Sequence, residues 1–284
     1  MPGFRLPDGA AMAYAEHGAG RPILLVHGWA AHGGFFDALA ARLAQSHRVL
    51  VPTLRAHPGS EPGQAPLTIE TLADDLCAFA EALELKQCIA VGWSMGAMAL
   101  WAAAPRLAAR LDGLVVEDMS PLLTNDSEWR FGLAGGYGAA DIDATLHEIE
   151  ADWPAYVARF APRMVAAGAR DAHAELIAWA QAEMSRAEPG AMAAYWRSMA
   201  GQDFRAALGK IKTPMRALYG AASQVYPEGA SAFIERAAPA ATRVAVNGAG
   251  HVPHLEAPDV FLNEIEAFVR ITRRPDLQSG GATP

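Results

Sequence analysis

Short apolar runs alternate along the chain with longer segments in which apolar residues recur every three or four positions. The short runs predict buried β-strands, and the longer segments predict amphipathic helices. Regular alternation of the two is typical of βαβ units, in which helices cover a mainly parallel sheet. We therefore expect an α/β fold with a mostly parallel, eight-stranded sheet that is flanked by helices.

The predicted elements can be placed along the chain, beginning with a hairpin around Asp8-Gly9. Strands are predicted at residues 4–6, 12–16, 23–26, 49–51, 88–91, 113–117, 215–219 and 242–246. Helices are predicted at residues 35–44, 69–83, 229–237 and 260–271, with one more that starts near Met95.

Strand signals stop after the sixth strand and resume only near residue 215. Between them the pattern is helical, with glycine-rich loop breaks at residues 132–138. We expect a helical cap at residues 122–210, inserted into a core made of residues 1–121 and 211–271. The end of the chain, residues 272–284, is rich in Gly, Pro and Ser and is expected to be disordered.

The length and the net charge of the chain reduce the number of function classes that fit the sequence. A chain of 284 residues can bury a large core, which makes a small binding module unlikely on size alone. The net charge of −8 and the lack of a basic patch disfavour nucleic-acid and membrane-surface partners. Without a signal segment or a long apolar run, the chain is expected to be cytoplasmic. Its two cysteines, Cys77 and Cys88, are expected to be free thiols.

The segment Gly92-Trp93-Ser94-Met95-Gly96 matches G-x-S-x-G and lies between a predicted buried strand and a predicted helix. A serine at such a sharp turn takes a strained backbone conformation that exposes its hydroxyl. The helix that follows directs free N–H groups toward an anion beside Ser94. We therefore predict that Ser94 is a nucleophile.

A serine hydroxyl needs a base, which is expected on a loop after a late strand. His251 follows the last predicted strand, and the small residues Gly248-Ala249-Gly250 allow its loop to approach Ser94. His254 is the alternative, but Pro253 and Leu255 beside it favour local packing. His251 is therefore the predicted base.

With these motifs, and with His27-Gly28-Trp29 after the third strand, the chain resembles the α/β-hydrolase superfamily. The similarity is to serine carboxylesterases with a helical cap, and some motifs resemble esterases that demethylate pimeloyl-carrier-protein methyl ester. The resemblance implies an oxyanion hole formed by the backbone N–H groups of Trp29 and Met95. It also implies that no cofactor or metal is needed.

The expected third catalytic residue is missing from its usual place. Relatives carry an aspartate in a G-x-x-D-x-x-x-P segment after the seventh strand, whereas here Ser223 and Gln224 stand at that point. We prefer Asp118, at the end of the sixth strand, because some capped relatives such as the haloalkane dehalogenases use an acid there. Glu117, Glu228 and the absence of any acid remain alternatives.

Aromatic residues are expected to form the substrate pocket, at Trp93 in the core and Trp129, Trp153, Trp179 and Trp196 in the cap. Such a pocket favours a small to medium ester with an apolar acyl or aromatic group. A dehalogenase is disfavoured because its nucleophile would be an aspartate.

Other functions remain open. The same residues would serve a lactonase, a carbon–carbon bond hydrolase or a perhydrolase, and the missing aspartate favours a non-catalytic ligand-binding protein. The cap carries eight Arg or Lys against twelve Asp or Glu, which disfavours an acidic carrier-protein partner. If Arg159, Arg163 and Arg170 cluster on one side of the cap, they would still allow an acidic carrier protein to bind.

Overall fold

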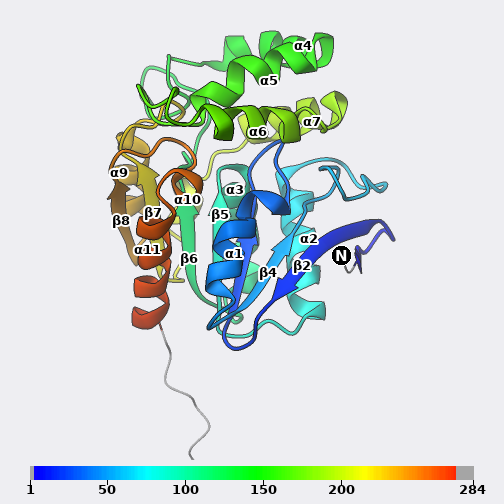
Figure 1. Cartoon of the computed structure of the whole chain (residues 1–284), viewed down its shortest axis with the longest axis vertical. Helices are drawn as coiled ribbons and strands as arrows, with labels where there is room; N and C mark the ends of the chain where they lie inside the picture. Colours follow the sequence, from blue (N-terminus) through cyan, green and yellow to red (C-terminus); the bar gives the residue numbers. More distant parts are fainter. Residues whose placement is uncertain (1–2, 273–284) are drawn as a thin grey trace, which may run out of the picture.

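The computed structural model describes residues 3–272 and contains one eight-stranded sheet in the order β1-β2-β4-β3-β5-β6-β7-β8 (Figure 1). β1 and β2 pair antiparallel, as do β2 and β4, and the remaining neighbours are parallel. The predicted fold class is therefore confirmed. The strands are β1 (Gly3–Arg5), β2 (Ala11–His17), β3 (Pro22–Val26), β4 (Arg48–Pro52), β5 (Cys88–Trp93), β6 (Leu111–Glu117), β7 (Met215–Gly220) and β8 (Ala241–Val246).

Helices cover both faces of the sheet, which explains why β5 and β6 are buried along their whole length and why β5 is apolar throughout. α1 packs with α11 in front of the sheet in Figure 1, while α2 and α3 pack together behind it. The core helices are α1 (Asp37–Leu43), α2 (Ile69–Ala82), α3 (Met95–Leu107), α9 (Glu228–Ala237), α10 (Pro253–Glu256) and α11 (Pro258–Ile271). The one-turn helix α10 is the core helix that the sequence pattern did not predict.

The segment between β6 and β7 forms a layer of helices over one end of the sheet (Figure 1). Because β6 ends just before this segment, the layer lies at the carboxyl end of the parallel strands. The helices are α4 (Ile142–Ala151), α5 (Trp153–Phe160), α6 (Ala174–Met184), α7 (Pro189–Ala200) and α8 (Arg205–Leu208). We use the word cap for α4 to α7 and their connections; the boundaries at residues 122 and 210 stay predictions.

The cap begins with a loop rather than a helix. The Asn125 side chain holds this loop closed, because its amide donates to the carbonyl oxygens of Leu133 and Tyr137 and its oxygen accepts the Gly132 N–H. The cap is also tied to the core by a 2.8 Å contact between His32 Nε2 and Glu183 Oε2. These bonds fix the position of the cap above the sheet end.

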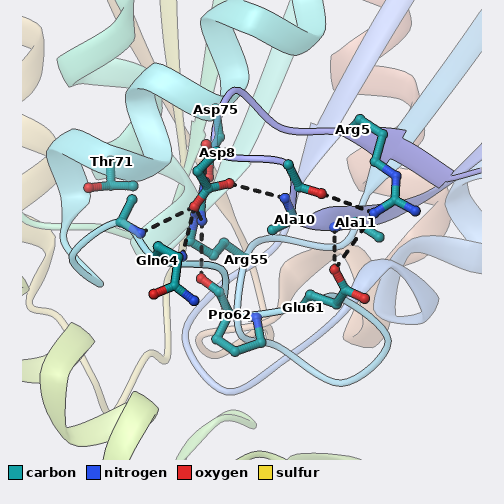
Figure 2. A network of polar contacts seen from close by, with 12 residues as sticks. Arg5, Asp8, Ala10, Ala11, Arg55, Glu61, Pro62, Gln64, Thr71 and Asp75 are labelled. Carbon is teal, nitrogen blue, oxygen red and sulfur yellow. Dashed lines mark hydrogen bonds and ion pairs between the residues drawn. The ribbon is translucent and has the colours of Figure 1, made fainter.

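A buried arginine fastens the N-terminal hairpin to the core (Figure 2). Arg55 follows β4 and donates two 2.8 Å hydrogen bonds to Asp75 of α2. Its Nη1 also donates to Asp8 in the turn between β1 and β2, and this bond holds the pKa of Asp8 well below its usual range. The Arg55 carbonyl accepts from the Tyr195 hydroxyl of α7, so the same residue reaches the cap.

Two further expectations concern the whole chain. Cys77 and Cys88 are free, as expected. Within residues 3–272, no helix is long and apolar enough to cross a membrane. All but the first residue of the predicted tail at 272–284 lies outside the described residues.

Candidate active site

Ser94 stands alone between β5 and α3, with φ +52° and ψ −120°. This left-handed conformation is unfavourable for a residue with a side chain and occurs where the surrounding structure imposes it. Here the Ser94 N–H donates to the carbonyl oxygen of Glu117 on the neighbouring strand, at 3.0 Å. The turn is therefore anchored from β6, and Ser94 stands directly before the N-terminus of α3.

Two glycines allow the backbone to close around Ser94. A Cβ atom on Gly96 would lie 2.2 Å from the carbonyl oxygen of Val26, so α3 meets the end of β3 without an intervening side chain. A Cβ atom on Gly28 would lie 3.2 Å from the Cβ of Ser94. The loop that carries Trp29 therefore runs directly beside Ser94, as an oxyanion hole formed with Met95 requires.

His27 holds this loop in place from inside the core. Its Nε2 accepts the Leu54 N–H at 2.9 Å, and its Nδ1 lies 2.8 Å from the carbonyl oxygen of Gly28. Burial lowers the pKa of His27, which keeps the ring neutral and able to accept the first of these bonds. These contacts give His27 a structural role, because they hold the loop that carries Trp29.

Asp118 meets His251, as the preferred prediction requires. Its Oδ2 lies 2.8 Å from His251 Nδ1, and both side chains are buried. The carboxylate also accepts the Ser223 hydroxyl at 2.7 Å and the Gly220 N–H at 3.2 Å, both from the end of β7. Ser223, which replaces the usual aspartate, thus holds the relocated carboxylate by a hydrogen bond.

The two alternative acids have other partners. Glu117 is the last residue of β6, directly before Asp118, and its carboxylate lies 2.7 Å from Nδ1 of His254. It also accepts the His254 N–H at 2.9 Å. Glu228 forms a 2.6 Å ion pair with Arg243 on the surface. His254 therefore packs locally, as expected, in a fully buried pair with Glu117.

The His251 loop is held from both the core and the cap. The His251 N–H donates to the carbonyl oxygen of Met164 in the cap at 2.7 Å, and its own carbonyl oxygen accepts the Trp93 indole N–H at 2.9 Å. Glu256 accepts the N–H groups of Gly250 and Ala166 at 2.6 Å each, which joins the same two parts. A shift of the cap would therefore move the histidine.

An enclosed cavity of about 20 Å³ lies beside Ser94, His251 and Tyr226. Its remaining wall is apolar, and it includes Trp29, Trp93, Phe160, Met164, Trp196 and Met199. This volume holds roughly one water molecule. In the described structure, the inner cavity is therefore shaped for a small group.

A larger cavity of about 280 Å³ adjoins the inner one and shares Leu133, Phe160 and Trp196 with it. Arg159 and Arg163 stand in its wall together with Glu148. Arg159 is paired with Glu148 at 2.8 Å. The outer cavity thus has arginine and glutamate side chains in its wall, unlike the inner one.

The five predicted pocket tryptophans separate into two groups. Trp93 and Trp196 line the inner cavity. Trp129 instead packs between Phe131 and Phe233, and Trp153 packs edge-on against the outside of Trp29. Trp179 packs against Phe35 and is 37% exposed. These three residues hold the cap together or fix it to the core. They were predicted as pocket residues because helical periodicity identifies a buried face without showing what that face covers.

Sequence reasoning did not assign any role to Tyr226, whose ring lies 5.7 Å from that of His251. Its position directly before Pro227, in the segment that usually carries the acid, was the available signal. In residues 3–272, no group of three or more His, Cys, Asp or Glu side chains is arranged to hold a metal ion.

Residues 23–264 match the sequence model of the alpha/beta hydrolase family. The chain belongs to this family. The match spans both sides of the cap and includes Ser94, Asp118 and His251, although a family match does not itself assign their roles.

Two curated relatives illustrate the similarity and carry the same name. The pimeloyl-[acyl-carrier protein] methyl ester esterase of Photobacterium profundum is 27% identical over 265 residues, covering 92% of this chain and 99% of its own length. The enzyme of the same name from Aromatoleum aromaticum is 28% identical and covers 87% and 98%. Both are similar in length and organisation to this chain.

Solved structures show the same fold at lower identity. An esterase from Exiguobacterium antarcticum matches with a TM-score of 0.87 and 19% identity, over 94% of this chain and 98% of that one. A bromoperoxidase from Bacillus anthracis also matches with 0.87, at 21% identity over 95% and 100%. Because proteins with different names share this fold, the function has to be inferred from the site rather than from the fold.

Proposed function

We propose that the protein is a serine hydrolase that cleaves carboxylic esters through an acyl-enzyme on Ser94. The observation that carries this proposal is the buried hydrogen bond between Asp118 and His251, because His251 lines the same cavity as the strained Ser94. A carboxylate on Nδ1 leaves Nε2 as the basic nitrogen and stabilises the imidazolium. The names of the curated relatives support the same reaction class.

In the proposed reaction, His251 Nε2 takes the proton of Ser94 as Oγ attacks the ester carbonyl carbon. The carbonyl π electrons move to its oxygen, and the N–H groups of Trp29 and Met95 stabilise that anion by about 3 kcal/mol each. The tetrahedral intermediate then collapses, and the alcohol leaves with the proton from His251. Water repeats the sequence on the acyl-enzyme and frees Ser94.

The cavities suggest which esters fit. The inner cavity is small and apolar, so one side of the ester is proposed to be a small apolar group. The outer cavity leaves room for the other side, against Tyr156, Phe160 and Trp196. This supports small to medium esters with an apolar or aromatic acyl group.

An ester carried on an acidic carrier protein is a second candidate. The names of the relatives favour it, and so do Arg159 and Arg163 in the outer cavity. The acidic balance of the cap disfavours it. Replacing both arginines with alanine is expected to raise KM for a carrier-linked methyl ester and leave KM for the free methyl ester unchanged; equal effects on both would exclude carrier recognition there.

The first test is hydrolysis of p-nitrophenyl esters from acetate to decanoate, together with labelling by a fluorophosphonate. The wild type is expected to be active and labelled, whereas Ser94→Ala should lose both by several orders of magnitude. Ser231→Ala is a control, because it removes a buried serine hydroxyl on α9 that donates to the Glu228 carbonyl oxygen and does not line the inner cavity. An inert, unlabelled wild type would contradict the proposal, whereas labelling without ester turnover would favour a lactonase or carbon–carbon bond hydrolase.

A further inference from the structure

The inner cavity exposes very few polar side-chain groups. Three tryptophans stand in its wall, but each indole N–H is already used: Trp29 donates to the carbonyl oxygen of Met192, Trp93 to that of His251, and Trp196 to the hydroxyl of Tyr137. The polar side chains that remain in the described wall belong to Ser94, His251 and Tyr226. Two of these have a role in the proposed function, and Tyr226 has none.

Tyr226 is held against the site by the turn that also holds the acid. Its backbone N–H and that of Val225 donate to the Ser223 hydroxyl oxygen at 3.4 and 3.2 Å, while the same hydroxyl donates to Asp118. The Tyr226 ring is buried, with its centroid 5.7 Å from that of His251. The ring position is therefore coupled to the Asp118–His251 pair.

The Tyr226 hydroxyl is a proton-bearing donor near neutral pH. Burial raises the pKa of Tyr226, and the nearby Asp118 carboxylate raises it further, while an interaction with the Ser94 side chain opposes both effects. A phenol that stays neutral in an apolar cavity keeps its O–H and seeks an acceptor. The side chain of Ser94 is such an acceptor in the same cavity.

We propose that Tyr226 is a further catalytic residue, whose hydroxyl donates a hydrogen bond to Ser94 Oγ when negative charge gathers on that oxygen. This inference rests on the proposed acyl-enzyme reaction. Charge gathers on Oγ twice: when it attacks the ester carbonyl, and when the C–Oγ bond of the acyl-enzyme breaks. The phenolic proton stays on Tyr226 throughout, since His251 accepts and returns the transferred proton.

The proposed bond differs from an oxyanion-hole contact because it acts on the nucleophile oxygen rather than on the carbonyl oxygen. Hydrogen bonds to charged groups contribute about 1.5–3 kcal/mol, which corresponds to a rate change of roughly ten- to hundredfold. An interaction made only in the transition state lowers kcat and kcat/KM equally when it is lost. The predicted signature is therefore a fall in kcat with an unchanged KM.

The test compares Tyr226→Phe and Tyr226→Met with the wild type, using single-turnover acylation and deacylation of one p-nitrophenyl ester. Both variants lack the hydroxyl but differ in shape, so each is expected to slow both steps by about ten- to hundredfold. Tyr195→Phe is the matched control, since it removes an equally buried tyrosine hydroxyl that bonds to Arg55 outside the cavity. Its acylation and deacylation rates are expected to stay at the wild-type values.

Thermal unfolding shows which variants are folded. Tyr226→Phe decides the test because it keeps the ring, and wild-type rates in a folded Tyr226→Met would also overturn the inference. Wild-type rates in Tyr226→Phe would overturn the inference, including the case in which only Tyr226→Met is slow, because ring packing would then explain the loss. A wild type that fluorophosphonate does not label contradicts the proposed function instead. Failure of the inference and failure of the proposed function are thus distinguishable.

Discussion

Moving the catalytic carboxylate between two strand ends is the most demanding test of the proposed site. Asp118→Asn keeps the size of the side chain but replaces the acceptor facing His251 Nδ1 with an amide that is able to donate. The ring is then free to take the tautomer with the proton on Nε2, which is unable to accept the proton of Ser94. We therefore expect kcat for p-nitrophenyl butyrate to fall with little change in KM.

The magnitude follows from the contacts of the carboxylate. Asp118 accepts from His251 at 2.8 Å, Ser223 at 2.7 Å and Gly220 at 3.2 Å, so its carboxylate is fixed in place next to the ring. Loss of the corresponding acid in a serine protease costs roughly 10⁴-fold in kcat. That factor equals about 5.5 kcal/mol, at 1.36 kcal/mol for each tenfold change.

A second substitution distinguishes a lost acid from a damaged fold. The Ser223 hydroxyl lies 2.7 Å from the Asp118 oxygen that meets His251, so an aspartate at 223 is expected to come within reach of the same ring nitrogen. The double variant Asp118→Asn with Ser223→Asp should regain at least about tenfold in kcat over Asp118→Asn. If Asp118→Asn stays within tenfold of the wild type, Asp118 is not the acid, and if the double variant regains nothing, the proposed equivalence of the two positions is wrong.

Three further predictions concern stability and specificity. Arg55→Met leaves Asp75 as an unpaired buried charge and should destabilise the fold by about 3–5 kcal/mol in urea unfolding, whereas a loss below 1 kcal/mol would show that the network in Figure 2 contributes little. Burial lowers the pKa of His57 to about 4 from 6.5, so the unfolded chain binds the extra proton as pH falls. The contribution of His57 to the free energy of unfolding is present above pH 6.5 and is smaller by about 2 kcal/mol at pH 5. An equal urea midpoint at pH 7 and pH 5 would contradict this prediction. Trp196→Phe, which enlarges both cavities, should shift the preferred acyl length in the p-nitrophenyl series, while Trp129→Phe should leave the preference unchanged; matching effects would place both residues in the pocket or neither.

Much of the sheet was predictable because its central strands are buried on both faces. β5 therefore appears in the sequence as a continuous apolar run, and β6 does so over residues 113–116. α10 was not predicted, because its four residues are too short for helical periodicity to register. Pro253 at its first turn was the only local signal.

The sequence alone does not identify which carboxylate is the partner of His251. Glu117 and Asp118 end the same strand, so composition and spacing do not separate them. The structure does, because the backbone turns at Asp118, with φ +41°, so that Asp118 meets His251 while Glu117 meets His254. Its catalytic role stays a prediction, as do those of Ser94, His251, Trp29 and Met95.

The pocket tryptophans were less predictable for a related reason. The sequence identifies apolar faces on the cap helices, but the face that meets the cavity depends on how the cap docks on the core. Trp196 lies toward Trp29, whereas Trp129 packs against Phe233 of α9. Neither partner is near its tryptophan in the sequence.

The bonds between Met164 and His251, and between Ala166 and Glu256, also form a cap–core seam, a set of contacts that a chimaera of two relatives has to keep. A chimaera that exchanges α4 and α5 with those of a relative alters the outer cavity and leaves the seam intact. One that crosses over within residues 161–167 separates the histidine loop from its support. New specificities on this scaffold should therefore arise more readily by exchange before Ala161 than by replacement of the whole cap.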